Sequence, residues 1–273
     1  MVFLPGTDRS VCEMEDVMKI DTQIVDRYLS GKPLLTGEED RIPLDQSALV
    51  MDRREVVAEL KTRTLASLQQ FPSFNPALFQ ALFPALGICQ KRLHVHLLVG
   101  SSDLCRTAKS DASFDVFIDL IQAANRTRIV SQMMYLILHT LHYEFARHCL
   151  LIHWPDGGRS YHERLDHLCF VEGLATYLAW NEDAADYRFY TDRYEQKKEQ
   201  AFGLLYHAFQ IEDAKVQEQI LSAPADIPFW NQFWVSASLF YLDDLYRSTG
   251  SDGLQSFCTQ GGRHFVETIF DLN

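Results

Sequence analysis

Cysteine pairs, phosphate-binding loops and long apolar runs are missing from this sequence, and each absence excludes a class of protein. The cysteines are scattered without CxxC spacing, which argues against a disulfide-stapled secreted scaffold. No GxxxxGK[ST], GxGxxG or GxSxG pattern occurs, so the usual nucleotide-binding loops and the nucleophile elbow are absent. The longest purely apolar run, Met133 to Leu138, is too short to span a bilayer.

Positive charge is also scarce. Lys and Arg number 25 against 37 Asp and Glu, giving a formal net charge of −12, and such an excess of acid repels a phosphate backbone. Residues 1–9 lack the basic head and apolar stretch of a signal peptide. We therefore expect a reduced, cytoplasmic protein with no nucleic-acid and no membrane partner; its oligomeric state is left open.

Apolar residues at three- and four-residue spacing predict helices along most of the chain. Period-two alternation predicts strands only at 93–99 and 114–120. The expected fold is α+β and predominantly helical, with a small sheet at about 93–120 followed by a helical half. We expect a helical N-terminal lobe over 1–90 and a second domain over 91–273. The expected helices are 11–30, 47–70, short helices within 71–90, then 127–153, 160–181, 184–210, 212–221, 229–248 and 252–259.

Six of the ten histidines lie between 139 and 167, most of them on the helix predicted over 127–153. An unpaired buried polar group costs about 1–3 kcal/mol, so imidazoles on an apolar helix need partners. Two imidazoles about one turn apart can share a zinc ion. A later helical segment, EGLATYL at 172–178, supplies a carboxylate, Glu172.

The order of strand (114–120), histidine-rich helix (127–153) and EGLATYL segment resembles the gluzincin clan of zinc metallopeptidases, over roughly 93–260. In that clan an HExxH helix is followed by a helix that opens E-G-hydrophobic-A, and its Glu is the third zinc ligand. The resemblance implies a zincin-like fold, a zinc ion and, if the protein is active, a peptidase-type hydrolase. It identifies Glu172 with the third ligand.

The central motif departs from the clan's pattern. Aligned on His139 as the first ligand, the segment reads HTLHY, with Thr140 in place of the catalytic Glu and Tyr143 in place of the second His. His142 is an unmatched imidazole that can share a helix face with His139. The candidate metal ligands are therefore His139, His142 and Glu172, and the other interpretation is a buried polar network left in place of a lost metal.

Thr140 cannot act as a base near neutral pH, so catalysis would need a carboxylate from elsewhere. The candidates are Glu144 and Glu163. A rival metal pair, His162 and Asp166, has i,i+4 spacing, but a solvated helix start is the simpler interpretation.

Three hypotheses follow. The first is a degenerate metallopeptidase-like protein that acts as a non-catalytic binding protein for a peptide or a protein. The second is a divergent zinc-dependent hydrolase that uses His139, His142 and Glu172. The third is a helical interaction protein unrelated to peptidases.

Overall fold

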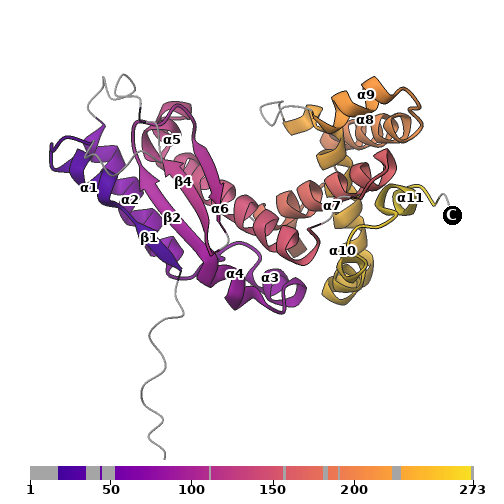
Figure 1. Ribbon diagram of the computed structural model, residues 1–273, viewed down its shortest axis with the longest axis horizontal. Helices are drawn as coiled ribbons and strands as arrows, with labels where there is room; N and C mark the ends of the chain where they lie inside the picture. The colour runs from indigo at the N-terminus through magenta and orange to yellow at the C-terminus, as the bar shows by residue number, and fades with distance from the viewer. Residues whose placement is uncertain are drawn as a thin grey trace, which may run out of the picture.

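The computed structural model describes residues 18–34, 44, 53–110, 112–155, 158–180, 184–189, 191–222 and 229–271. Helices dominate this part of the chain, as expected, and its strands form one sheet (Figure 1). None of the described helices has the length and apolarity needed to cross a membrane. The elements are β1 (Lys19–Asp21), α1 (Gln23–Leu29), α2 (Arg54–Leu68), α3 (Pro76–Leu82), α4 (Leu86–Arg92), β2 (Leu93–Leu98), β3 (Cys105–Lys109), β4 (Phe114–Asp119), α5 (Leu120–Arg126), α6 (Val130–His153), α7 (Tyr161–Ala179), α8 (Asp192–Phe209), α9 (Ala214–Leu221), α10 (Phe233–Thr259) and α11 (Phe265–Ile269).

The sheet is mixed, with strand order β1-β2-β4-β3. The pairs β1–β2 and β2–β4 are parallel, whereas β3 runs antiparallel to β4 at the edge. The two strands expected from alternation are confirmed as β2 and β4, in which Val95 and Val116 are fully buried and their sequence neighbours are half-buried. The helix expected over 11–30 is wrong at 19–21, where the three residues of β1 form a strand, and α1 begins only at Gln23. The strand β3 was not expected, because it is mostly polar and exposed.

The long helix α6 connects the two halves of the molecule. It packs against α2, α5 and β4 on one side and against α7 on the other, and Figure 1 shows it between the sheet and the C-terminal helices. His148 of α6 stacks on Phe114 of β4 with ring centroids 4.2 Å apart. Side chains of α6 therefore lie between the sheet and α7.

The boundary expected near residue 90 does not coincide with a break in packing. The strand β1 belongs to the same sheet as β2 and β4, and α2 packs on α5 and α6. The helix α3 contacts α10 near the other end of the chain. The described N-terminal elements thus share one core with the rest, while residues 11–17 and 47–52 of the two expected N-terminal helices lie outside the described residues.

The helices α7 and α10 approach closely at Gly173. A Cβ atom added there would lie 2.2 Å from Cβ of Ser238, which is shorter than real Cβ contacts allow. Glycine is thus required at this crossing by the neighbouring helix. Within α10, Gly250 has φ 69°, which interrupts the helix where the sequence predicts a break between 248 and 252.

We predict that Gly173→Ala lowers the free energy of unfolding by about 1–3 kcal/mol, because the added methyl group overpacks the α7–α10 crossing. Gly203→Ala in α8 is the control, since a Cβ there meets nothing within 4 Å. It should be neutral or stabilising by up to about 1 kcal/mol. Urea unfolding of both variants measures the difference, and equal stabilities would contradict the close-packing argument.

Candidate functional site

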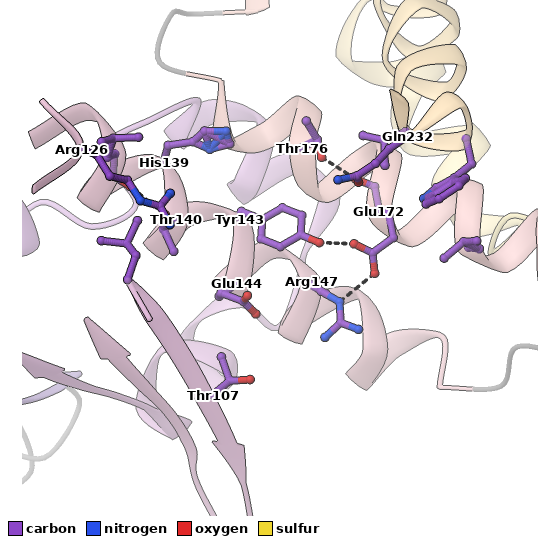
Figure 2. Close-up of a pocket in the computed structure, with 15 residues that line it drawn as sticks. Thr107, Arg126, His139, Thr140, Tyr143, Glu144, Arg147, Glu172, Thr176 and Gln232 are labelled. Atoms are coloured by element: carbon purple, nitrogen blue, oxygen red, sulfur yellow. Dashed lines mark hydrogen bonds and ion pairs between the residues drawn. The ribbon is translucent and has the colours of Figure 1, made fainter. Parts of the chain in front are cut away.

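A cavity of about 680 Å³ lies between β3, α6, α7 and the start of α10 (Figure 2). Two of its walls carry charged and polar groups from α6 and α7, and Trp234 and Val235 of α10 add apolar surface. The lining residues are Leu104, Thr107, Arg126, Leu136, His139, Thr140, Tyr143, Glu144, Arg147, Leu168, Glu172, Thr176, Gln232, Trp234 and Val235.

The Glu172 carboxylate is held by two side chains one helical turn apart on α6. The Tyr143 hydroxyl donates a hydrogen bond to Oε2, and Arg147 Nε donates to Oε1 at 2.8 Å (Figure 2). The Glu172 side chain is only 15% exposed, so these donors replace most of its hydration. Both carboxylate oxygens are therefore engaged by α6.

Burial and neighbouring charges keep Tyr143 and Arg147 protonated. Burial, reinforced by the negative charge of Glu172, raises the pKa of Tyr143 well above its ordinary value, so the phenol remains a donor. Burial alone would lower the pKa of Arg147, but the carboxylate of Glu172 raises it overall. A guanidinium has no lone pair and a protonated phenol is a poor ligand, so Glu172 is the one strong metal ligand within the network.

Glu144 is a half-buried carboxylate that lines the same cavity. It follows Tyr143 on α6 and lies on the side of Thr107 of β3 (Figure 2). Among the described residues, none donates a hydrogen bond to its carboxylate. Burial raises the pKa of Glu144 to about 6; Arg147 opposes this shift and Glu172 adds to it. A carboxylate in this state is available to bind a cationic or hydrogen-bonding group of a ligand.

His139 and Thr140 line the same cavity but do not contact Glu172 through a hydrogen bond. Burial lowers the pKa of His139 to about 4, so its imidazole is neutral at pH 7, and its ring packs against Tyr135 with centroids 5.5 Å apart. The Thr140 hydroxyl donates to the backbone carbonyl of Leu136 at 2.7 Å.

His142, expected as a metal ligand, has both ring nitrogens engaged by the backbone. Its Nε2 accepts the backbone N–H groups of Ser73 at 2.8 Å and Phe74 at 3.0 Å, which makes Nδ1 the protonated nitrogen that donates to the Leu138 carbonyl at 2.7 Å. Its ring also stacks on Phe74 with centroids 4.3 Å apart. No ring nitrogen is left for an ion, so His139, His142 and Glu172 do not form the expected triad.

Glu163, expected as an alternative base, is instead a helix-capping residue. It forms a capping box with Ser160 at the start of α7 and is exposed. Backbone N–H groups of Ser160 and Arg159 lower its pKa, which favours the carboxylate in this structural role. The rival pair is also separately engaged: His162 hydrogen bonds the Phe209 carbonyl, and Asp166 accepts the backbone N–H of Val266.

A second group of potential ligands lies on the sheet. Within the described part of the chain, His94, His96 and Asp115 are the one set of three side chains whose ligand atoms all lie within 4.8 Å of one another and could hold a metal ion. Sequence reasoning missed this group. The signal that could have found it is the His-x-His spacing inside the strand predicted over 93–99, because alternate residues of a strand share a face.

Comparison with known proteins gives this chain no relative: no family model, curated protein or solved structure matches it. The functional argument therefore rests on the geometry of the cavity and of the sheet.

We predict that Glu144→Gln changes how stability depends on pH. The unfolded carboxyl ionises near its ordinary pKa of 4.5, whereas the folded one ionises at about 6. Between these values the folded state keeps a proton that the unfolded state has lost, so stability falls as pH rises and stays lower above pH 6.

Glu144→Gln removes this titration. The variant should be more stable than the wild type by about 1–2 kcal/mol at pH 7.5, with the difference shrinking at pH 4. Denaturant unfolding at the two pH values measures it. A variant less stable than the wild type at pH 7.5 would show that the Glu144 carboxylate is stabilised rather than strained.

Proposed function

We propose that this protein is a non-catalytic binding protein built on a metallopeptidase-like scaffold, which holds a peptide or a segment of another protein in the cavity. The observation that carries this proposal is the pairing of Glu172 with Tyr143 and Arg147. These two residues are one turn apart on α6 and both reach the carboxylate offered by α7.

The pairing suggests a different alignment from the one that the sequence favours. In an HExxH helix the two metal ligands are at i and i+4, the general base is at i+1, and the third ligand comes from a later helix. The i,i+4 pair that meets Glu172 is Tyr143 and Arg147, and the residue at i+1 is Glu144. Under this alignment Glu144 retains the acid of the motif, and Tyr143 and Arg147 replace its two histidines. The motif then begins at residue 143, four residues after His139.

The replacements explain why we propose binding and not hydrolysis. Zinc-dependent hydrolysis needs a metal-bound water that a carboxylate can deprotonate. Arg147 supplies a positive charge to Glu172 but offers no lone pair to an ion. A Glu144 carboxylate would then have no activated water to act on, so its remaining role is to contact a bound ligand.

The walls of the cavity suit an extended chain. Thr107 lines it from β3, which is an edge strand of the sheet. An edge strand can pair with an added strand, which gives main-chain hydrogen bonds to a peptide of any sequence. Glu144 then offers a carboxylate to a cationic group, and Trp234 supports an apolar side chain.

A zinc-dependent hydrolase that uses His139, His142 and Glu172 is not favoured, because both nitrogens of His142 are bonded to the backbone. Zinc at this cavity would also have to displace Arg147 and Tyr143 from Glu172. The proposal therefore keeps the scaffold of the metallopeptidase hypothesis without its metal.

The alignment is tested by restoring both ligands. Tyr143→His with Arg147→His should create one zinc site per chain, because it re-forms an HExxH sequence that faces Glu172. Zinc is measured by elemental analysis, in a chain that also carries His94→Gln and His96→Gln so that the sheet cluster does not contribute.

The matched control is Thr140→Glu with Tyr143→His, which completes the alignment on His139 instead. It should gain no zinc, because Arg147 would still hold the Glu172 carboxylate that has to serve as the third ligand. Zinc in the control and none in the first variant would refute the alignment on Tyr143 and Arg147.

Binding without hydrolysis is tested by passing tryptic casein peptides over the immobilised full-length chain. Tryptic peptides carry an ammonium group that Glu144 can bind. The wild type should retain peptides that mass spectrometry finds intact, and Glu144→Gln should retain them about tenfold less, since a hydrogen bond to a charged group contributes about 1.5–3 kcal/mol.

Glu199→Gln on the exposed face of α8 makes the same chemical change away from the cavity and should retain peptides as the wild type does. New cleavage products, or equal retention by the Glu144 and Glu199 variants, would contradict the proposed function.

A further inference from the structure

The face of the sheet opposite the cavity carries a cluster of nitrogen and oxygen ligands. Directly paired residues of neighbouring strands point to the same face, and His94 pairs with Asp115 across β2 and β4. Thr107 pairs with Val116, one residue further along β4, and so faces the cavity side. The cluster and the cavity therefore lie on opposite faces of one sheet.

The ligand atoms converge on one carboxylate oxygen. Asp115 Oδ1 lies 2.8 Å from His96 Nε2 and 3.4 Å from His94 Nδ1. A tetrahedral ion with bonds of about 2.0–2.1 Å places its ligand atoms about 3.3–3.4 Å apart. Small side-chain rotations would therefore convert this cluster into three corners of a coordination tetrahedron.

Neighbouring groups hold the ligands in the required orientation. The Ser113 hydroxyl donates to Asp115 Oδ2 at 2.8 Å, which leaves Oδ1 directed at the histidines. His96 Nδ1 lies 3.4 Å from Asp21 Oδ2 of β1, and its ring stacks on Phe117 with centroids 4.5 Å apart. A carboxylate on the far nitrogen of a ligating imidazole fixes its tautomer and raises its basicity.

We propose that His94 Nδ1, His96 Nε2 and the Asp115 carboxylate bind a divalent transition-metal ion of the zinc type. Two imidazoles and one carboxylate suit Zn²⁺ and its neighbours, whereas Mg²⁺ and Ca²⁺ prefer oxygen ligands throughout. Three protein ligands leave a fourth position for water or for a ligand atom of a partner.

The site is accessible to an ion from solution. The side chains of His94, His96 and Asp115 are 23%, 24% and 17% exposed. Lys19 projects from the same face beside His94, but it is exposed on the edge strand and can turn to solvent. This metal site does not depend on the proposed binding function, because none of its ligands lines the cavity.

The test uses the full-length chain, stripped of metal with a chelator and titrated with Zn²⁺ alone in a calorimeter. The wild type should bind one Zn²⁺ per chain, and zinc should raise its melting temperature by mass action. His94→Gln with His96→Gln should abolish stoichiometric binding and the thermal shift. Asp21→Asn, which removes only the outer carboxylate, should weaken binding about 10- to 100-fold.

His139→Gln is the matched control, because it removes an imidazole that lines the cavity instead. It should bind zinc as the wild type does. Circular dichroism establishes that each variant is folded, and Asp115→Asn provides a second ligand variant should the double variant not fold. The proposal is overturned if the wild type binds no more zinc than the double variant, or if His139→Gln alone removes the metal.

Discussion

The buried carboxylate of Glu172 is the constraint around which the cavity is organised. A carboxylate taken out of water between two helices must be neutralised and hydrogen bonded, or the helices cannot pack there. Here a guanidinium and a phenol from one face of α6 meet that requirement. Under the proposed alignment with zinc peptidases, a metal ion and two imidazoles would meet the same requirement. The same packing demand can therefore be met by an internal cation, which keeps the scaffold stable without a metal.

The substitution has a chemical consequence for the neighbouring acid. Under the proposed alignment Glu144 stands where a general base would serve a metal-bound water, yet Tyr143 and Arg147 occupy the places of the two imidazoles that would bind the metal. Its raised pKa of about 6 reflects burial without a hydrogen-bond donor among the described residues. Such a group is costly to the folded protein, and a cost of this kind is commonly retained where a ligand relieves it. This reasoning favours binding over hydrolysis.

The sheet separates two kinds of chemistry. On one face Thr107 of the edge strand borders the cavity, and on the other face His94, His96 and Asp115 converge. Period-two alternation makes this possible, because adjacent residues of a strand point to opposite sides. We therefore infer that any metal chemistry of this protein belongs to the sheet and that ligand recognition belongs to the cavity between the helices.

The sequence by itself determined the elements that carry the site. Their periodicity predicts β2, β4, α6 and α7, and the EGLATYL segment singles out Glu172. It could not choose which turn of α6 meets Glu172. Positions 139, 142, 143 and 147 lie within one broad stripe of the helix, and only the axial register of two packed helices decides among them.

Tertiary structure made that choice by turning His142 toward the backbone of residues 73 and 74 and by bringing Tyr143 and Arg147 to Glu172. The tertiary structure also forms the cluster on the sheet, since His94 and Asp115 come together only through the pairing of β2 with β4. Hydrophobic periodicity is a local property that can be read directly from a short stretch of sequence. Contacts between distant elements depend on packing and on strand register, which are fixed only when the whole core forms.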